Sequence, residues 1–249
     1  MMKKFLLLSV AAVLAGCFGK VIETSYYQLD YVPTPQSMTR ENPYMQTLRI
    51  KDFEVSEAYR RNNIVYRQSP YELHFYNYEQ WAVKPEYLVA DMLFAHFNAA
   101  KIFTAVKRGV DSEDPDFVVS GTIRALEEYD NQDEWYAHLA MSMNLTDNKS
   151  RQVLWSREWN YRKKVGNQEP VFVVRALSEL LERINNEAVA DIDSVVSEVA
   201  QGAYCVVPQA TANYAQPRIT DDTPNTKNTN DKNTDNIIFE KLPPPEEIK

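Results

Sequence analysis

Hydrophobic and polar positions alternate along several stretches in the first half of the chain, as they do in half-buried β-strands. Two of these runs lie on either side of Pro70, a residue that favours a tight turn, and they predict a β-hairpin. The strands predicted in this half cover residues 26–32, 47–55, 64–67, 72–76 and 102–106.

A longer alternation extends through three runs between residues 117 and 161 and predicts an antiparallel three-strand meander with one buried face. The apolar positions of these runs are Phe117, Val119, Ile123 and Ala125, then Ala137, Leu139, Met141, Met143 and Leu145, then Val153, Trp155, Trp159 and Tyr161.

Two stretches repeat their apolar residues every three or four positions, the spacing of one helix face. One helix is predicted to begin at Pro85, and a long one at Pro170 carries an apolar stripe to Val199. The pattern predicts one α+β domain over residues 26–200. Its mostly antiparallel sheet ends in the C-terminal three-strand meander and is packed on one face by the two helices.

The first residues resemble a bacterial lipoprotein signal peptide. Lys3 and Lys4 precede an apolar run of about ten residues, which is too short to span a bilayer. Leu14-Ala15-Gly16-Cys17 follows and resembles the lipobox, in which the cysteine is acylated and becomes the first residue. We therefore expect a signal peptide over residues 1–16, a lipid on Cys17 and a tether to residue 25. By resemblance to bacterial sorting rules, Phe18 favours the outer membrane, with the domain in the periplasm.

The last residues, 201–249, are rich in proline, asparagine and threonine and predict a disordered tail. An apolar triplet at residues 237–239 precedes Pro243, Pro244 and Pro245. This segment is either a short docking peptide or an end that does not fold.

The net charge and the absence of certain motifs argue against several classes of function. The formal net charge is −8, whereas nucleic-acid binding needs clustered Lys and Arg, so no nucleic-acid partner is expected. The chain has no phosphate-binding glycine loop and no G-x-S-x-G nucleophile elbow. With Cys17 acylated, Cys205 is the one remaining thiol and no intramolecular disulfide can form.

Candidate chemistry is sparse. Glu72 and His74 would share one strand face as a possible metal pair, but no third ligand lies nearby in the sequence. The acidic residues 130–134 lack the spacing of a calcium loop and predict a solvated turn. We expect no metal, no cofactor and no enzymatic activity.

Aromatic side chains are concentrated between residues 66 and 81, and aromatics with polar groups are enriched at interfaces and membrane surfaces. Part of this set is expected to fill the core. The candidate partner-binding residues are Arg67, Tyr71, Tyr76, Tyr78 and Trp81.

The lipobox, Tyr26-Tyr27-Gln28-Leu29 behind it, Ile64-Val65-Tyr66-Arg67, and Tyr76 with Trp81-Ala82 before the Pro85 helix occur in this order. Together they resemble the ABC-type transport auxiliary lipoprotein family, over residues 24–200. The resemblance implies a non-enzymatic periplasmic subunit that docks an MCE-domain periplasmic protein at the outer membrane. Through that protein it would reach an inner-membrane ABC permease and ATPase. Two alternatives remain: an outer-membrane assembly or secretion scaffold, and a lipid-anchored hydrolase using Glu72 and His74.

Overall fold

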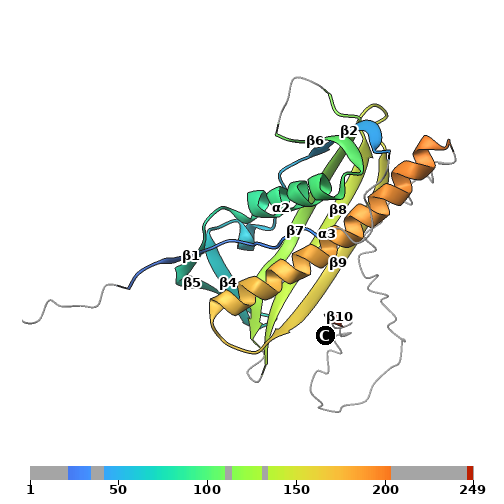
Figure 1. The fold of residues 1–249 in the computed structure, drawn as a ribbon. Helices are drawn as coiled ribbons and strands as arrows, with labels where there is room; N and C mark the ends of the chain where they lie inside the picture. The colour runs from blue at the N-terminus through green and yellow to red at the C-terminus, as the bar shows by residue number, and fades with distance from the viewer. Residues whose placement is uncertain (1–21, 35–41, 110–113, 131–133, 203–245, 249) are drawn as a thin grey trace, which may run out of the picture.

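Two helices lie across one face of a curled β-sheet (Figure 1). The structure, a computed structural model, describes residues 22–34, 42–109, 114–130, 134–202 and 246–248. The helices are α2 (Pro85–Ala100) and α3 (Pro170–Ala200). The strands are β1 (Ser25–Tyr27), β2 (Tyr44–Ile50), β3 (Glu54–Val55), β4 (Asn63–Ser69), β5 (Glu72–Trp81), β6 (Phe103–Arg108), β7 (Phe117–Asp130), β8 (Trp135–Asp147), β9 (Val153–Val165) and β10 (Glu246–Ile248). These elements confirm the α+β class.

The sheet is mixed, so the predicted dominance of antiparallel pairing is not confirmed. Its main order is β1-β5-β4-β7-β8-β9-β10, and β2 and β3 also pair with β7. Three short strands, β2, β3 and β4, pair in turn along one edge of β7, and all three run parallel to it. Parallel neighbours need a long crossover connection, which β5, α2 and β6 provide here between β4 and β7.

The long strands β7, β8 and β9 pair antiparallel in chain order. Their register shifts between Ile123 and Ala125, where Arg124 is an extra residue on β7, a β-bulge. Strict alternation places Ala125 with Ile123 on the buried face, and this expectation is wrong. The bulge reverses the two faces, so Leu126 and Glu128 face the helices and Glu127 faces away.

The predicted strand over residues 47–55 is interrupted. β2 ends at Ile50, and the chain rejoins the sheet only at Glu54. Between them Phe53 turns inward onto Gly121, where a Cβ atom would overlap with the Phe53 ring and the Ser142 carbonyl oxygen. Only glycine therefore leaves room for Phe53 at this point of β7.

Both helices begin at the predicted prolines, whose missing N–H costs nothing in a first turn. α2 ends where Lys101 adopts the left-handed conformation, with φ of 54°. The apolar stripe of α3 is buried against β8 and β9 from Val174 to Ile192, whereas Val171 in the first turn is exposed. None of the helices in the described ranges has the length and apolarity needed to cross a bilayer.

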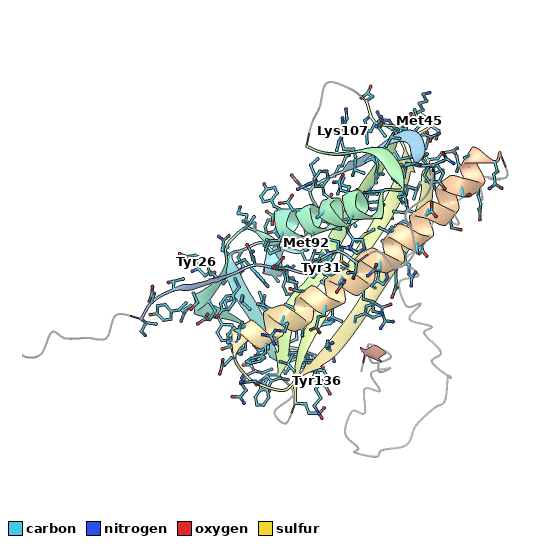
Figure 2. The ribbon with its side chains drawn as sticks, in the orientation of Figure 1. Tyr26, Tyr31, Met45, Met92, Lys107 and Tyr136 are labelled. Carbon is cyan, nitrogen blue, oxygen red and sulfur yellow. The ribbon has the colours of Figure 1, made fainter. Side chains whose placement is uncertain are left out.

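The predicted strand over residues 26–32 is shorter than expected, because its partner β5 ends at Trp81. The chain then crosses the helices, as the position of Tyr31 in Figure 2 illustrates. The Asp30 N–H donates to Ser178 Oγ on α3. The Tyr31 hydroxyl accepts from Asn185 Nδ2 at 2.6 Å and is hydrogen-bonded to His96 Nδ1 at 3.2 Å. This segment thus connects α2 to α3.

The predicted signal peptide, Cys17 and the apolar triplet at 237–239 lie outside the described residues. Within the predicted tail, Glu246–Ile248 forms β10 and pairs in parallel with β9.

Candidate functional site

A buried carboxylate lies where the β4–β5 hairpin meets β7 and β8, on the sheet face opposite the helices. The carboxylate belongs to Glu127, whose side chain is 1 % exposed. In the strand register, Glu127 on β7 lies opposite Val65 of β4 on one side and His138 of β8 on the other. The β-bulge at Arg124 produces this position, since without it Glu127 would point toward the helices.

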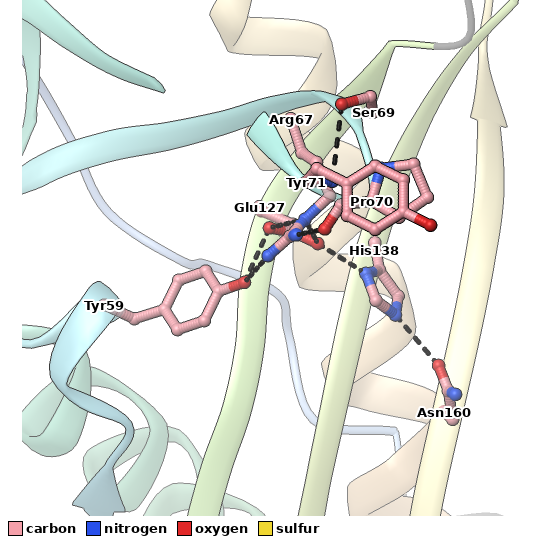
Figure 3. Close-up of polar contacts among 8 residues, drawn as sticks. All are labelled: Tyr59, Arg67, Ser69, Pro70, Tyr71, Glu127, His138 and Asn160. Carbon is pink, nitrogen blue, oxygen red and sulfur yellow. Dashed lines mark hydrogen bonds and ion pairs between the residues drawn. The ribbon is translucent and has the colours of Figure 1, made fainter. Parts of the chain in front are cut away.

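Three side chains surround the Glu127 carboxylate (Figure 3). The Tyr59 hydroxyl donates to Oε2 at 2.6 Å, and Arg67 Nε lies 3.1 Å from both oxygens. On the other side His138 Nδ1 is 2.9 Å from Oε1, while its Nε2 is 2.8 Å from Asn160 Oδ1. We call these five residues, Tyr59, Arg67, Glu127, His138 and Asn160, the Glu127 cluster.

Arg67 also connects the cluster to the hairpin turn. Its Nη1 donates to the Pro70 carbonyl at 3.0 Å, and its Nη2 donates to the Tyr59 hydroxyl at 3.1 Å. The next residue, Tyr71, is 93 % exposed, and its N–H donates to Ser69 Oγ. An exposed aromatic side chain therefore stands on a turn that is tied to a buried charge.

The electrostatics favour the charged pair. Burial raises the pKa of Glu127, but hydrogen bonds from His138 and Tyr59 and the charges of His138 and Arg67 outweigh it, so the pKa lies below its usual value. Burial and the contact with Glu127 raise the pKa of Tyr59. Burial lowers the pKa of Arg67, but its contacts with Tyr59 and Glu127 more than reverse this effect. Glu127 is thus ionised at neutral pH.

The arrangement holds elements together and lacks the parts of a reaction centre. Each Glu127 oxygen already accepts two donors, which fills the acceptor capacity of a carboxylate. Across the described ranges, no three His, Cys, Asp or Glu side chains are placed to hold a metal ion. The cluster fixes the η2 turn (Glu57–Tyr59), β4 and β8 to β7.

Comparison with known proteins identifies the family of the folded domain. The model of the family described as ABC-type transport auxiliary lipoprotein component matches residues 27–189. The chain belongs to this family. It is therefore a membrane-anchored lipoprotein and an auxiliary component of an ABC-type transport system.

Solved structures share the fold of this auxiliary lipoprotein. Protein XCC0632 from Xanthomonas campestris is 17% identical, with a TM-score of 0.63 over 71% of this chain and 99% of its own. An uncharacterized protein is 16% identical, with a TM-score of 0.55 over 69% of this chain and 99% of its own. At these identities the similarity concerns the fold. The search of curated proteins returned no match.

The five predicted partner-binding residues of the lipoprotein do not form one surface. Arg67 and Tyr71 lie together at the hairpin turn, and Tyr78 is exposed near the other end of β5. Tyr76 instead donates its hydroxyl to Glu128 Oε2 at 3.0 Å. Trp81 is 1 % exposed, so it belongs to the core, and its expected contact with a partner is wrong.

In the described residues no third metal ligand joins Glu72 and His74. The His74 ring stacks on Tyr66, with the ring centroids 5.0 Å apart.

Sequence reasoning missed Glu127 and the second large carboxylate cluster of the lipoprotein. Glu187 on α3 accepts hydrogen bonds from Arg157, Trp159 and Tyr161 of β9, and these hold α3 against β9. Glu187 also accepts one from Arg183 on its own helix. It also lines a cleft of about 450 Å³ beside Thr34 and Glu182. For the Glu127 cluster the sequence did contain a signal. Glu127 and Glu128 are adjacent charges inside an otherwise apolar strand, and buried charges require partners.

Proposed function

We propose that this lipoprotein is a non-enzymatic docking subunit, anchored to the outer membrane on its periplasmic side, of an MCE-type intermembrane lipid transport system. The observation that carries the proposal is the family match over residues 27–189 behind the lipobox cysteine Cys17. The docking partner would be an MCE-domain periplasmic protein, which in turn contacts the inner-membrane ABC permease and ATPase.

The lipid on Cys17 supplies the attachment. Each buried methylene contributes about 0.8 kcal/mol, so several acyl chains hold a protein in a membrane permanently. Phe18 favours the outer membrane over retention in the inner membrane. The domain then faces the periplasm, where a protein crossing from the inner membrane can reach it.

The hairpin turn is the part of the surface best suited to docking. Tyr71 offers an exposed aromatic ring with a polar end, the kind of side chain enriched among energetically dominant interface residues. Arg67 fixes the turn to Glu127 before any partner arrives. Such preorganisation lowers the conformational entropy lost on binding.

The test is site-specific photo-crosslinking in cells, with a benzophenone amino acid replacing Tyr71 in the full-length lipoprotein. Met45, which is 81 % exposed on β2, gives a matched control. The two sites lie near opposite ends of β7, because β2 pairs with its start and Arg67 with Tyr129 near its end. We expect an MCE-domain protein to be crosslinked from position 71 and not from position 45.

Two results would contradict the proposal. Crosslinking of an outer-membrane pore or assembly β-barrel from position 71 would support the scaffold alternative. Recovery of the acylated lipoprotein in the inner-membrane fraction would exclude the outer-membrane docking role.

A further inference from the structure

Exposed apolar side chains are concentrated at one end of the lipoprotein. Five of the nine large apolar side chains that are exposed in the described ranges lie within residues 22–26 and 78–87. They are Ile22, Tyr26, Tyr78, Val83 and Tyr87. Scattered apolar residues are normal on a protein surface, but a group at one end marks an interaction site.

Strand pairing brings the two stretches together. β1 pairs with β5 in parallel, with Tyr26 beside Gln80, and the Ala82 N–H donates to the Tyr27 carbonyl at 2.7 Å. Tyr78 lies two residues before Gln80 on β5, and its side chain is exposed like that of Tyr26. We call Ile22, Tyr26, Tyr78 and Val83 the β1 end.

The neighbouring residues on these two strands point the other way. Tyr27 packs against the core beside Trp81, whereas Tyr26 is 66 % exposed and Tyr78 is 43 % exposed. Figure 2 shows Tyr26 at the extremity of the molecule where the described chain begins. Tyr26 is thus exposed on the edge strand β1, and Tyr78 is exposed on the neighbouring strand β5.

The covalent chain determines what this end can reach. Cys17 precedes Tyr26 by nine residues, which span at most about 30 Å when fully extended. Tyr71 lies beyond the opposite end of β5, and ten strand residues add about 30 Å of separation. If Cys17 is acylated, the β1 end is held close to the bilayer, while the hairpin turn can point away from it.

The chemistry of the β1 end suits the membrane–water interface. Tyrosine places an apolar ring and a polar hydroxyl at headgroup depth, and it is enriched there in membrane proteins. The charges nearest in sequence are Lys20, Glu23, Glu79, Lys84 and Glu86, an acidic balance that offers little attraction to anionic lipid. Contact would therefore depend on the aromatic and aliphatic side chains.

We propose that the β1 end rests on the surface of the bilayer that holds the acylated Cys17 and so orients the domain. This inference rests on the lipid anchor of the proposed function. In this orientation Tyr26 and Tyr78 contact the membrane, and the hairpin turn with Tyr71 faces the periplasmic partner.

The test uses the acylated full-length chain in vesicles of phosphatidylethanolamine and phosphatidylglycerol with brominated acyl chains, which quench nearby indole fluorescence. A Tyr26→Trp variant reports on the β1 end, and Tyr71→Trp is the matched control, since Tyr71 is even more exposed. Each signal is taken as the difference from the parent chain, which contains four tryptophans. We expect at least twofold stronger quenching for Tyr26→Trp, with no loss when phosphatidylglycerol is omitted.

Equal quenching of the two reporters, or no quenching of Tyr26→Trp, would overturn the membrane contact. So would photo-crosslinking from position 26 to a protein in place of lipid. Mass spectrometry of the N-terminal peptide separates this result from failure of the proposed function. If Cys17 carries no acyl groups, the lipid anchor of the proposed function is contradicted. If Cys17 is acylated but the Tyr26→Trp reporter is not quenched, only the proposed orientation of the domain is contradicted.

Discussion

Glu127 and Glu128 are neighbours on β7 and both are buried, yet their environments shift their pKa values in opposite directions. Glu127 is 1 % exposed and Glu128 is 3 % exposed, on opposite faces of the sheet. Burial raises the pKa of Glu128, with a smaller rise from Asp130, and the single hydrogen bond from Tyr76 does not offset it. The pKa of Glu127 is lowered in spite of similar burial.

The difference shows that the partners of a buried carboxylate decide its charge state. Desolvation penalises both carboxylates, but only Glu127 has three donor side chains around it, one of them a guanidinium. The Glu127 side therefore fixes the hairpin turn by ionic contacts. On the helix-facing side, Glu128 makes a weaker contact whose strength depends on pH.

The largest expected effect follows removal of the cation. In Arg67→Ala the Glu127 carboxylate stays buried without its ion pair, which typically costs about 3–5 kcal/mol. Urea unfolding of the variant measures the loss. Arg60→Ala, which breaks an exposed pair with Glu57 and one hydrogen bond to the Val55 carbonyl, is the control and should cost about 1 kcal/mol. Similar losses of unfolding free energy in both variants would show that the buried Glu127–Arg67 pair stabilises the fold no more than an exposed pair does.

Replacing each glutamate by glutamine tests the comparison as a function of pH. A lowered folded-state pKa means that ionised Glu127 stabilises the fold above pH 4.5, and this contribution is lost as pH falls through the folded-state pKa. Glu127→Gln should therefore lose about 1.5–3 kcal/mol at pH 7, the usual range for hydrogen bonds to a charged group. The difference from the parent should shrink in acid.

Glu128→Gln should behave in the opposite way. A raised folded-state pKa gives a favourable contribution that is complete below pH 4.5 and is lost as pH rises through the folded-state pKa. The amide does not ionise, so the variant should gain stability relative to the parent at pH 7 and match it in acid. Urea unfolding from about pH 2 to pH 8 compares the two variants, because the Glu127 contribution is lost only below pH 4.5. Slopes of the same sign would refute the distinction.

A smaller effect is expected from removing one hydroxyl on each face. Tyr76→Phe takes away the donor to Glu128 and should cost about 1–3 kcal/mol, because a buried acceptor is left unsatisfied. Tyr59→Phe should cost about 1 kcal/mol, since Arg67 and His138 still contact Glu127. Thermal unfolding of both variants at neutral pH gives the order, and a larger loss for Tyr59→Phe would reverse it.

The smallest effect on stability is expected at Tyr71. Tyr71→Ala removes an exposed ring and should change the free energy of unfolding by less than about 0.5 kcal/mol. Capture of the MCE-domain partner should nevertheless fall, which separates docking from folding. Unchanged capture would move the docking surface away from the hairpin turn.

The periodic patterns predicted the elements that depend on local sequence. Both helices begin at the expected prolines, and the hairpin strands β4 and β5 surround the expected Pro70 turn. Predictions that depended on contacts between residues far apart in the sequence were less accurate. Trp81 is predicted to bind a partner but is buried in the core. The strand predicted over residues 47–55 is interrupted where Phe53 packs on Gly121.

Taken by itself, the sequence determined the α+β class, the helix starts and, through the lipobox and ordered motifs, the family, because these depend on the local order of residues. Only the tertiary structure decided which strands run parallel and which glutamate has partners. One extra residue at Arg124 turns Glu127 toward Arg67 and His138 and turns Glu128 toward the helices. Alternation cannot reveal a bulge, since the shift is a property of two paired strands and their hydrogen bonds.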